Sequence, residues 1–313
     1  MMKQVVKGIH HVTGIAGSTL KTIDFYTRIL GLRLVKKTVH LDDPSIYQFY
    51  FGNTFGDPGT LLSLIPWGTF FSKTFNLNSA AQIAFTIPSS AFQFWLQRFE
   101  KEHVIHDKPS SRFKEKFIAF KDPDGLTLEL VANNQDERTS VITEDISKTN
   151  GIRGIFSCTL ICNDYVPISK VLTNILGYKK VCQHKNRYRY TTDTKSSAAI
   201  IDLVQMPTSK IVSNTFGGIQ HIAFEVQSEH ELFEIKMALD AIGLHPTPII
   251  DSVYFKSIYF NIGENFLFKI ATHTPGFTVD ELLGDLGTNL KLPEIYKNSR
   301  FFVERILPPL NFT

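Results

Sequence analysis

The stretch GIHHV at residues 8–12 returns as GIQHI at residues 218–222. GIFSC at residues 154–158 keeps the first half of the same frame, and AQIAF at residues 81–85 carries its second half. Each of these stretches runs on in β-branched and aromatic residues for the length of a strand. Repetition of this kind indicates copies of one supersecondary unit, so we expect four related units with these strands at their starts.

A helix is expected behind each of these strands, because a residue able to cap a helix N-terminus follows every one of them. These capping candidates are Ser18, Ser89, Asp164 and Ser228. Three of the helices should end at a repeated motif whose glycine favours helix termination: ILGL at 29–32, ILGY at 175–178 and AIGL at 241–244. Strand-like runs broken by turn residues come next, as in residues 116–132. The unit therefore reads βαβββ.

The four units predict an α+β fold in which βαβββ modules pair into two domains with curved, mixed, mainly antiparallel sheets. Residues 133–151 are polar and lack a hydrophobic period, which is typical of a linker. We expect neighbouring modules to pair, with an N-terminal domain, a linker, a C-terminal domain and a tail that packs across the second domain. The boundaries expected for them are 1–135, 136–151, 152–275 and 276–313.

Composition excludes several classes of protein. The 313 residues include 33 Lys and Arg against 30 Asp and Glu, with no basic run, which argues against a nucleic-acid partner. Apolar runs are too short for a membrane span, and no secretory signal precedes the first histidines, so a cytoplasmic location is expected. Cys158, Cys162 and Cys182 have neither zinc nor redox spacing and are expected to be free thiols. A homodimer is expected from base rates alone.

The repeat also aligns polar positions on the first strands. Matching GIHH with GIQH puts His11 in register with His221, and puts Gln82 and Ser157 at the equivalent places of the other units. Neighbouring side chains of a strand point to opposite faces, so His10 and His11 are not expected to enter one cavity. His11 and His221 are therefore the histidines expected to meet.

A second set of positions aligns on the last strands of the units. LTLELVA at the end of the second unit matches FLFKIAT at the end of the fourth, which puts Glu129 opposite Lys269. Ser63 and Asp202, or their neighbours, fall at this place in the first and third units. Histidine on one strand and a carboxylate on another that faces the same concave side is the pattern of a divalent-metal site.

Several longer motifs resemble a known family: GIHHVT, FYTRILGLRLVKKTVHLDDP, DPGTLLSLIPW, QHIAFEV, YFKSIYF and TPGF. They are similar to the ring-cleaving dioxygenases of the vicinal-oxygen-chelate superfamily, which also holds glyoxalases and bleomycin-resistance proteins, and to its hydroquinone-opening branch in particular. The resemblance runs from residue 8 into the tail and implies glyoxalase-like domains. It also implies Fe(II) or Mn(II) held by two His and one Glu, with open positions for an aromatic diol and dioxygen.

By this resemblance His11 and His221 are metal ligands, but the third ligand is changed. The family motif FEIAT reads FKIAT at residues 268–272, so Lys269 occupies the position of the glutamate. An ammonium beside a dication costs about 4 kcal/mol per unit charge product at about 4 Å and an effective dielectric of about 20. Lysine is a ligand only when deprotonated. Glu264, the nearby carboxylate of the same hairpin, falls in the turn.

Other family positions are partly kept. Thr13 and Tyr259 match, as catalytic or substrate-side groups, and His10 falls beside the first ligand. Gln220 stands where a histidine is common, and Ser252 where an arginine is common, as substrate or supporting positions. Lys36, Lys37 and His40 are expected to be solvated.

Two principal functions stay open from the sequence. One is a ring-cleaving dioxygenase of hydroquinones or catechols with a degenerate Fe(II) or Mn(II) site. The other is a protein of the same fold that binds an aromatic diol or a quinone-like molecule, holds no metal and catalyses nothing. A glyoxalase-like isomerase or thiol transferase is a third alternative. The 26 Phe and 10 Tyr fit an aromatic ligand as well as they fit core packing.

Overall fold

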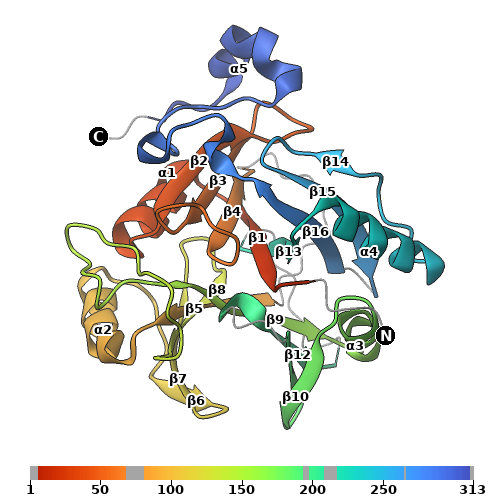
Figure 1. The fold of residues 1–313 in the computed structure, drawn as a ribbon. Coiled ribbons are helices and arrows are strands. Elements are labelled where there is room, and N and C mark those ends of the chain that lie inside the picture. The colour runs from red at the N-terminus through yellow and green to blue at the C-terminus, as the bar shows by residue number, and fades with distance from the viewer. Residues whose placement is uncertain (1–5, 68–80, 193–196, 208–216, 264–265, 311–313) are drawn as a thin grey trace.

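The computed structural model describes residues 6–67, 81–192, 197–207, 217–263 and 266–310. Two mixed sheets of eight strands each make up the body of the molecule, and one lies above the other in Figure 1. Most neighbouring strands in them run antiparallel, and the parallel pairs join the first and last strand of each module. The α+β class with curved, mainly antiparallel sheets is confirmed.

The upper sheet, here called sheet A, joins strands from the two ends of the chain. In spatial order its strands are β14 (Ile250–Asp251), β15 (Phe255–Ile262), β16 (Phe266–Pro275), β13 (Ile219–Val226), β1 (Ile9–Ala16), β4 (Leu61–Pro66), β3 (Tyr47–Gly52) and β2 (Arg33–Val39).

The lower sheet, sheet B, is built from the middle of the chain. Its strands are β10 (Lys179–His184), β11 (Arg187–Thr191), β12 (Ile200–Gln205), β9 (Gly154–Cys162), β5 (Ala81–Ile87), β8 (Thr127–Ala132), β7 (Glu115–Lys121) and β6 (Ser110–Arg112).

The expected pairing of neighbouring modules is wrong. Sheet A holds the first and fourth modules, joined where Val12 of β1 lies opposite Ile222 of β13. Sheet B holds the second and third, joined where Ile83 of β5 lies opposite Cys158 of β9. The first strand of every module hydrogen-bonds its own last strand along one edge only, and the free edge can accept the first strand of any other module. The linear order of the modules does not record which free edges meet.

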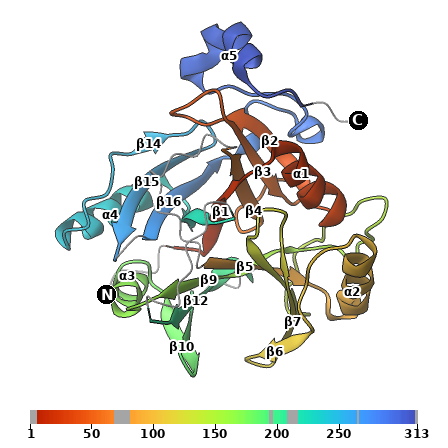
Figure 2. The same cartoon turned by 180° about the vertical axis from the view of Figure 1, so that it is seen from behind.

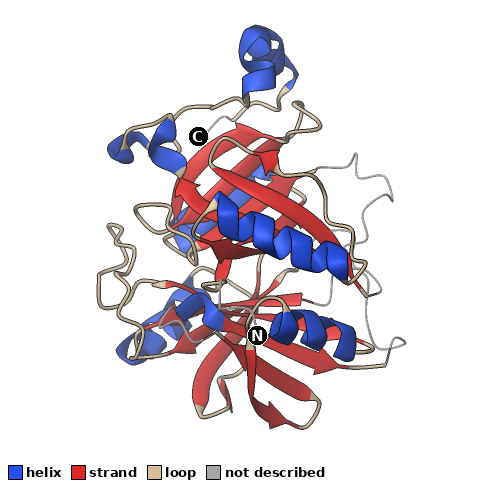
Figure 3. Cartoon of the chain, turned by 45° about the vertical axis from the view of Figure 1, so that its right-hand side comes forward, coloured by secondary structure: helices blue, strands red, loops and turns tan. Residues whose placement is uncertain are grey.

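The helices lie outside the two sheets, and the last of them stands clear of both (Figures 1 and 3). They are α1 (Thr19–Asp24), which continues as a π-helical turn over Phe25–Ile29, α2 (Phe92–Lys101), α3 (Val166–Asn174), α4 (Glu229–Ala241) and α5 (Arg300–Ile306). Ser228 caps α4 as expected, since its side chain accepts a hydrogen bond from the Glu231 amide. The expected helix stop at Gly31 has a φ of 73°, in the left-handed region that favours glycine. In the described part of the chain, no helix has both the length and the apolar character needed to cross a membrane.

The C-terminal tail folds back over the first module, and α5 lies at the end of the molecule farthest from sheet B (Figure 2). Lys36 of β2 is fully buried and pairs with Asp280, at 2.6 Å, and with Glu281. Its expected exposure is therefore wrong, because carboxylates some 240 residues later in the chain cover it. The tail was expected on the second domain, but these ion pairs hold it against the first module.

Candidate functional site

Two of the expected histidines meet on the central strands of sheet A. His11 lies on β1 and His221 on β13, and their Nε2 atoms are 3.3 Å apart although 210 positions separate them in the sequence. Both are buried. The antiparallel pairing of β1 with β13 brings them together, since Thr13 lies opposite His221 and His11 lies opposite Ala223.

His10 contacts His11 directly, with their Nδ1 atoms 2.8 Å apart and their rings edge to face. Strict alternation along a strand would separate these two rings. The register of β1 against β13 shifts between Ile9 and His11, and such an irregularity re-aims a side chain locally. His10 also packs edge to face on Phe255, with ring centroids 5.1 Å apart.

Hydrogen bonds join the three histidines into one chain. Gln220 Oε1 can only accept, so His221 donates to it from Nδ1, 3.1 Å away. His221 and His11 face each other through their Nε2 atoms, and His11 and His10 through their Nδ1 atoms, so one nitrogen of each contact carries the proton and the tautomer decides which. His10 also hydrogen-bonds the backbone of Thr272.

Burial and positive neighbours hold these rings neutral. Burial lowers the pKa of His10 from 6.5 to about 3, and the charge of Lys269 acts in the same direction. The pKa of His11 is lowered well below its usual value by burial and by His10 and Lys269. Burial and Lys269 also lower the pKa of His221. None of the three is expected to be protonated at neutral pH.

Lys269 lies on β16 and is almost fully buried, with 3% of its surface exposed. Its Nζ donates to the hydroxyl of Tyr259, 2.7 Å away on β15, and lies 4.6 Å from the ring centres of both Tyr259 and Phe255. Burial lowers the pKa of Lys269 from 10.5 to about 7. Burial also raises the pKa of Tyr259, so its phenol is neutral at physiological pH.

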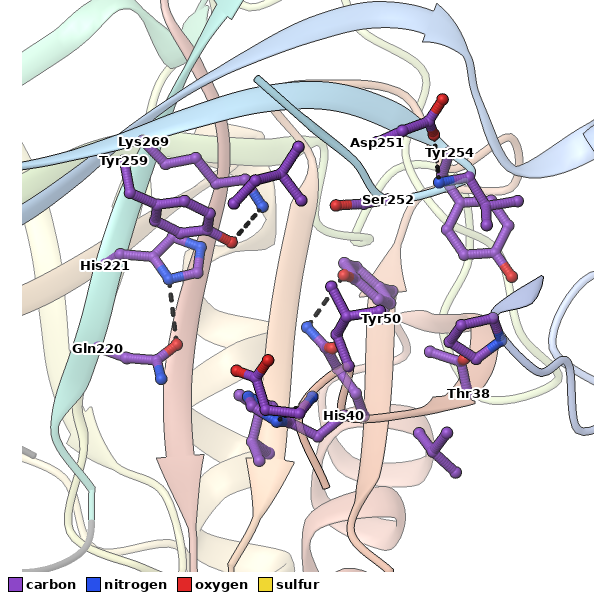
Figure 4. Close-up of a pocket in the computed structure, with 18 of the residues that line it drawn as sticks. Thr38, His40, Tyr50, Gln220, His221, Asp251, Ser252, Tyr254, Tyr259 and Lys269 are labelled. Carbon is purple, nitrogen blue, oxygen red and sulfur yellow. Dashed lines mark hydrogen bonds between the residues drawn. The ribbon is translucent and has the colours of Figure 1, made fainter. Parts of the chain in front are cut away.

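These groups line one end of a cavity of about 710 Å³ (Figure 4). Of the expected site residues, His221, Lys269, Tyr259, Gln220 and Ser252 line it. Among the described residues, His10, His11 and Thr13 are not part of the lining, and all three are buried. The Thr13 hydroxyl finds no hydrogen-bond partner within the described ranges. Glu264 lies outside the described residues.

The opposite wall of the cavity was not found from the sequence. Tyr50 accepts a hydrogen bond from Gln48 Nε2 at 2.9 Å, and His40, expected to be solvated, lines the cavity beside them. The tail adds Pro293 and residues 294–295. Gln48 and Tyr50 are two positions apart on β3 and so lie on one face of the strand, which could have been recognised from the sequence. No sequence pattern indicates that the tail contributes to the cavity.

The donor set was tested against the divalent metal that the motifs imply. Two imidazole nitrogens bound to one ion at about 2.1 Å would lie about 3.0–3.4 Å apart, as the Nε2 atoms of His11 and His221 do. However, no group of three or more His, Cys, Asp or Glu side chains suited to a metal occurs in the described part of the chain. Lys269 supplies no anion, and the histidine chain is satisfied without an ion. The described residues do not fit the facial site of two His and one carboxylate.

Comparison with known proteins places this chain in a family. The model of the Glyoxalase/Bleomycin resistance protein/Dioxygenase superfamily matches residues 8–130. A relative from Bacillus subtilis (strain 168), named "Putative ring-cleaving dioxygenase MhqE", is 34% identical over 304 residues, which are 97% of this chain and 99% of the relative. The chain belongs to the glyoxalase/dioxygenase superfamily.

Further relatives in this superfamily point to the same group. The chlorohydroquinone/hydroquinone 1,2-dioxygenase of Sphingobium indicum is 28% identical over 300 residues, covering 92% of this chain and 91% of that protein. The crystal structure of a dioxygenase, titled putative, from Bacillus subtilis subsp. subtilis str. 168 superposes with a TM-score of 0.91 at 32% identity, with 99% of both chains covered. All three relatives are thus named as dioxygenases, and members of the superfamily typically bind a divalent metal.

Proposed function

We propose that this chain binds a small aromatic diol or quinone in the cavity of sheet A without cleaving its ring. The observation that supports this most strongly is the side chain of Lys269, which supplies no negative charge, at the position of the third metal ligand. It removes the anion that a divalent ion needs beside two neutral imidazoles. The ligand class is inferred from the hydroquinones in the name of one relative, and the binding place is inferred from the cavity.

The cavity offers what a flat phenolic ligand requires. Aromatic side chains of Tyr50, Tyr254 and Tyr259 form much of its wall, and His40 joins them. Polar groups in its lining can orient a ring with two oxygens, because Lys269 can donate and Ser252 can donate or accept. Rings stacking against such walls bury apolar area while the hydroxyls keep their hydrogen bonds.

A second candidate is metal-dependent ring cleavage, as in the named relatives. The separation of 3.3 Å between the Nε2 atoms of His11 and His221 favours it. Ring cleavage by this route requires Lys269 to bind the metal ion as a neutral amine beside the two histidines. No carboxylate among the described residues completes this set of ligands.

Calorimetry and oxygen uptake on one preparation separate the two candidates. The purified protein should bind about one equivalent of hydroquinone anaerobically without metal, and should consume no oxygen after addition of Fe(II). Ser252→Trp, which puts an indole ring in place of a small side chain of the cavity wall, should abolish binding. Stoichiometric iron together with oxygen uptake would establish the second candidate instead. Absence of hydroquinone binding in every preparation would overturn the proposal.

A further inference from the structure

Lys269 is a buried amine that has no counter-ion in the described part of the chain. Its Nζ makes one hydrogen bond, to the Tyr259 hydroxyl, and the side chain forms no ion pair with any carboxylate among the described residues. It lines the cavity and points toward the space that Ser252 borders (Figure 4). An amine placed in this way is open to a ligand in the cavity.

A second buried lysine shows what an ammonium requires in this protein. Lys36 is fully buried, and its Nζ is surrounded by Asp280, Glu281 and the carbonyl of Phe277. That arrangement surrounds the nitrogen with two carboxylates and a carbonyl oxygen, which is how a buried ammonium is usually stabilised. Lys269 has a phenol and two ring faces instead. Burial lowers its pKa from 10.5 to about 7, so a large share of the amine is neutral at physiological pH.

A neutral primary amine in an aromatic-walled cavity is a nucleophile, and the electrophile that fits such walls is a flat ring with activated carbons. We propose that Lys269 captures a quinone covalently, by adding its amine to a ring carbon. This rests on the proposed function, because the quinone must first occupy the cavity. The family motif has a glutamate at this position, and a glutamate has no amine with which to carry out this reaction.

The addition balances without any other reactant. The Nζ lone pair forms a bond to the ring carbon at the far end of a C=C–C=O system. The π electrons of that C=C shift through the system, and the negative charge comes to rest on the carbonyl oxygen. One amine proton and the proton of the attacked ring carbon pass to the two quinone oxygens, which restores the aromatic ring. The product is an amino-hydroquinone on Lys269 that contains every atom of the quinone. Two electrons have moved within the adduct, so no external oxidant or reductant is consumed.

Tyr259 is placed to move the first proton. Its hydroxyl lies 2.7 Å from Nζ, so it can accept the amine proton while its own proton passes to the new oxyanion. Its raised pKa keeps it a neutral phenol, which is the form that can donate. Tyr259 acts here as a positioning and proton-transfer residue in direct contact with the nucleophile.

Mass spectrometry with 1,4-benzoquinone as the probe tests the proposal. The Cys182→Ser variant is used throughout, because this half-exposed thiol would react with the probe on its own account. At about pH 7.5 and short reaction times, one adduct with the mass of a whole quinone should form, and peptide mapping should find it on Lys269. Labelling there should exceed that of surface lysines by about a hundredfold, since an ordinary lysine is almost fully protonated.

Two variants serve as matched controls. Lys269→Met should lose the adduct and bind hydroquinone more weakly, because one of the groups that orient the ring is gone, whereas Tyr259→Phe should slow labelling and leave its site unchanged. Hydroquinone binding by the unmodified protein with no preference for Lys269 in labelling would overturn this inference and leave the proposed function standing. Failure of hydroquinone to bind, together with unselective labelling, would overturn both.

Discussion

Glu129 in sheet B and Lys269 in sheet A hold the same place in their modules. Glu129 of β8 lies opposite Ala84 of the adjacent parallel strand, and Lys269 of β16 lies opposite Ala223 in the same manner. The carboxylate of Glu129 is held by both terminal nitrogens of Arg112. Lys269, among the described residues, hydrogen-bonds the hydroxyl of Tyr259 and no carboxylate.

The difference extends to the other side of each sheet. Asp202 of β12 accepts two hydrogen bonds from Arg189, at 2.8 and 2.9 Å, and one from Arg187 at 3.1 Å. The equivalent residue in sheet A is the neutral Ser63 of β4, which accepts from Gln48. The same fold therefore has two different interiors: ion pairs occupy the interior of sheet B, whereas His221 and the amine of Lys269 border the cavity of sheet A.

The largest expected effect comes from breaking the ion pairs of sheet B. Asp202→Ala leaves the buried Arg189 and the partly buried Arg187 without their common partner, which should cost about 3–5 kcal/mol of unfolding free energy. Urea denaturation measures it. The exposed pair of Arg300 and Glu304 provides the control, since Glu304→Ala should leave the unfolding free energy nearly unchanged. Equal effects of the two substitutions would show that the network of sheet B stabilises nothing.

Lys269 should make stability rise with pH. The unfolded chain keeps this proton up to about pH 10.5, whereas the folded chain releases it near pH 7, so between these values the unfolded state binds more protons. Stability should therefore increase by about 2 kcal/mol between about pH 7 and pH 9. Lys269→Met should remove this increment in denaturation curves across that range. An identical slope in both proteins would mean that folded Lys269 keeps its proton.

The histidine chain should make the protein sensitive to acid. The pKa of folded His10 is about 3 against 6.5 for a free histidine, so the unfolded state takes up a proton first as the pH falls below 6.5. Protonation of this group in the unfolded state should lower the free energy of unfolding by about 1.5 kcal/mol between about pH 6.5 and pH 5. His10→Asn keeps a donor near the Nδ1 position and should reduce the acid slope. A slope that does not change would assign the acid sensitivity elsewhere.

Much of the fold could be predicted because the repeat carries it. The register of the sheets matches the sequence alignment position by position, as for Glu129 and Lys269. The choice of partner modules could not be predicted, because every first strand has an equivalent free edge. The burial of Lys36 could not be predicted either, because its carboxylate partners in the tail belong to no periodic pattern.

The candidate site was predictable to a similar extent. The repeat identified His11 and His221 as positions that meet, and the family motif singled out Lys269. Contact between His10 and His11 depends on an irregularity of β1 that alternation cannot anticipate. The wall opposite Lys269 includes the tail, which is remote in sequence from every motif.

The central claim is that residue 269 decides whether the cavity of sheet A holds a metal. Anaerobic titration with Fe(II), followed by desalting and metal analysis, tests it most directly when the natural protein and Lys269→Glu are compared. The account predicts that the natural protein retains no iron, whereas the variant retains about one equivalent and consumes oxygen with hydroquinone. Equal iron retention by both proteins would contradict it.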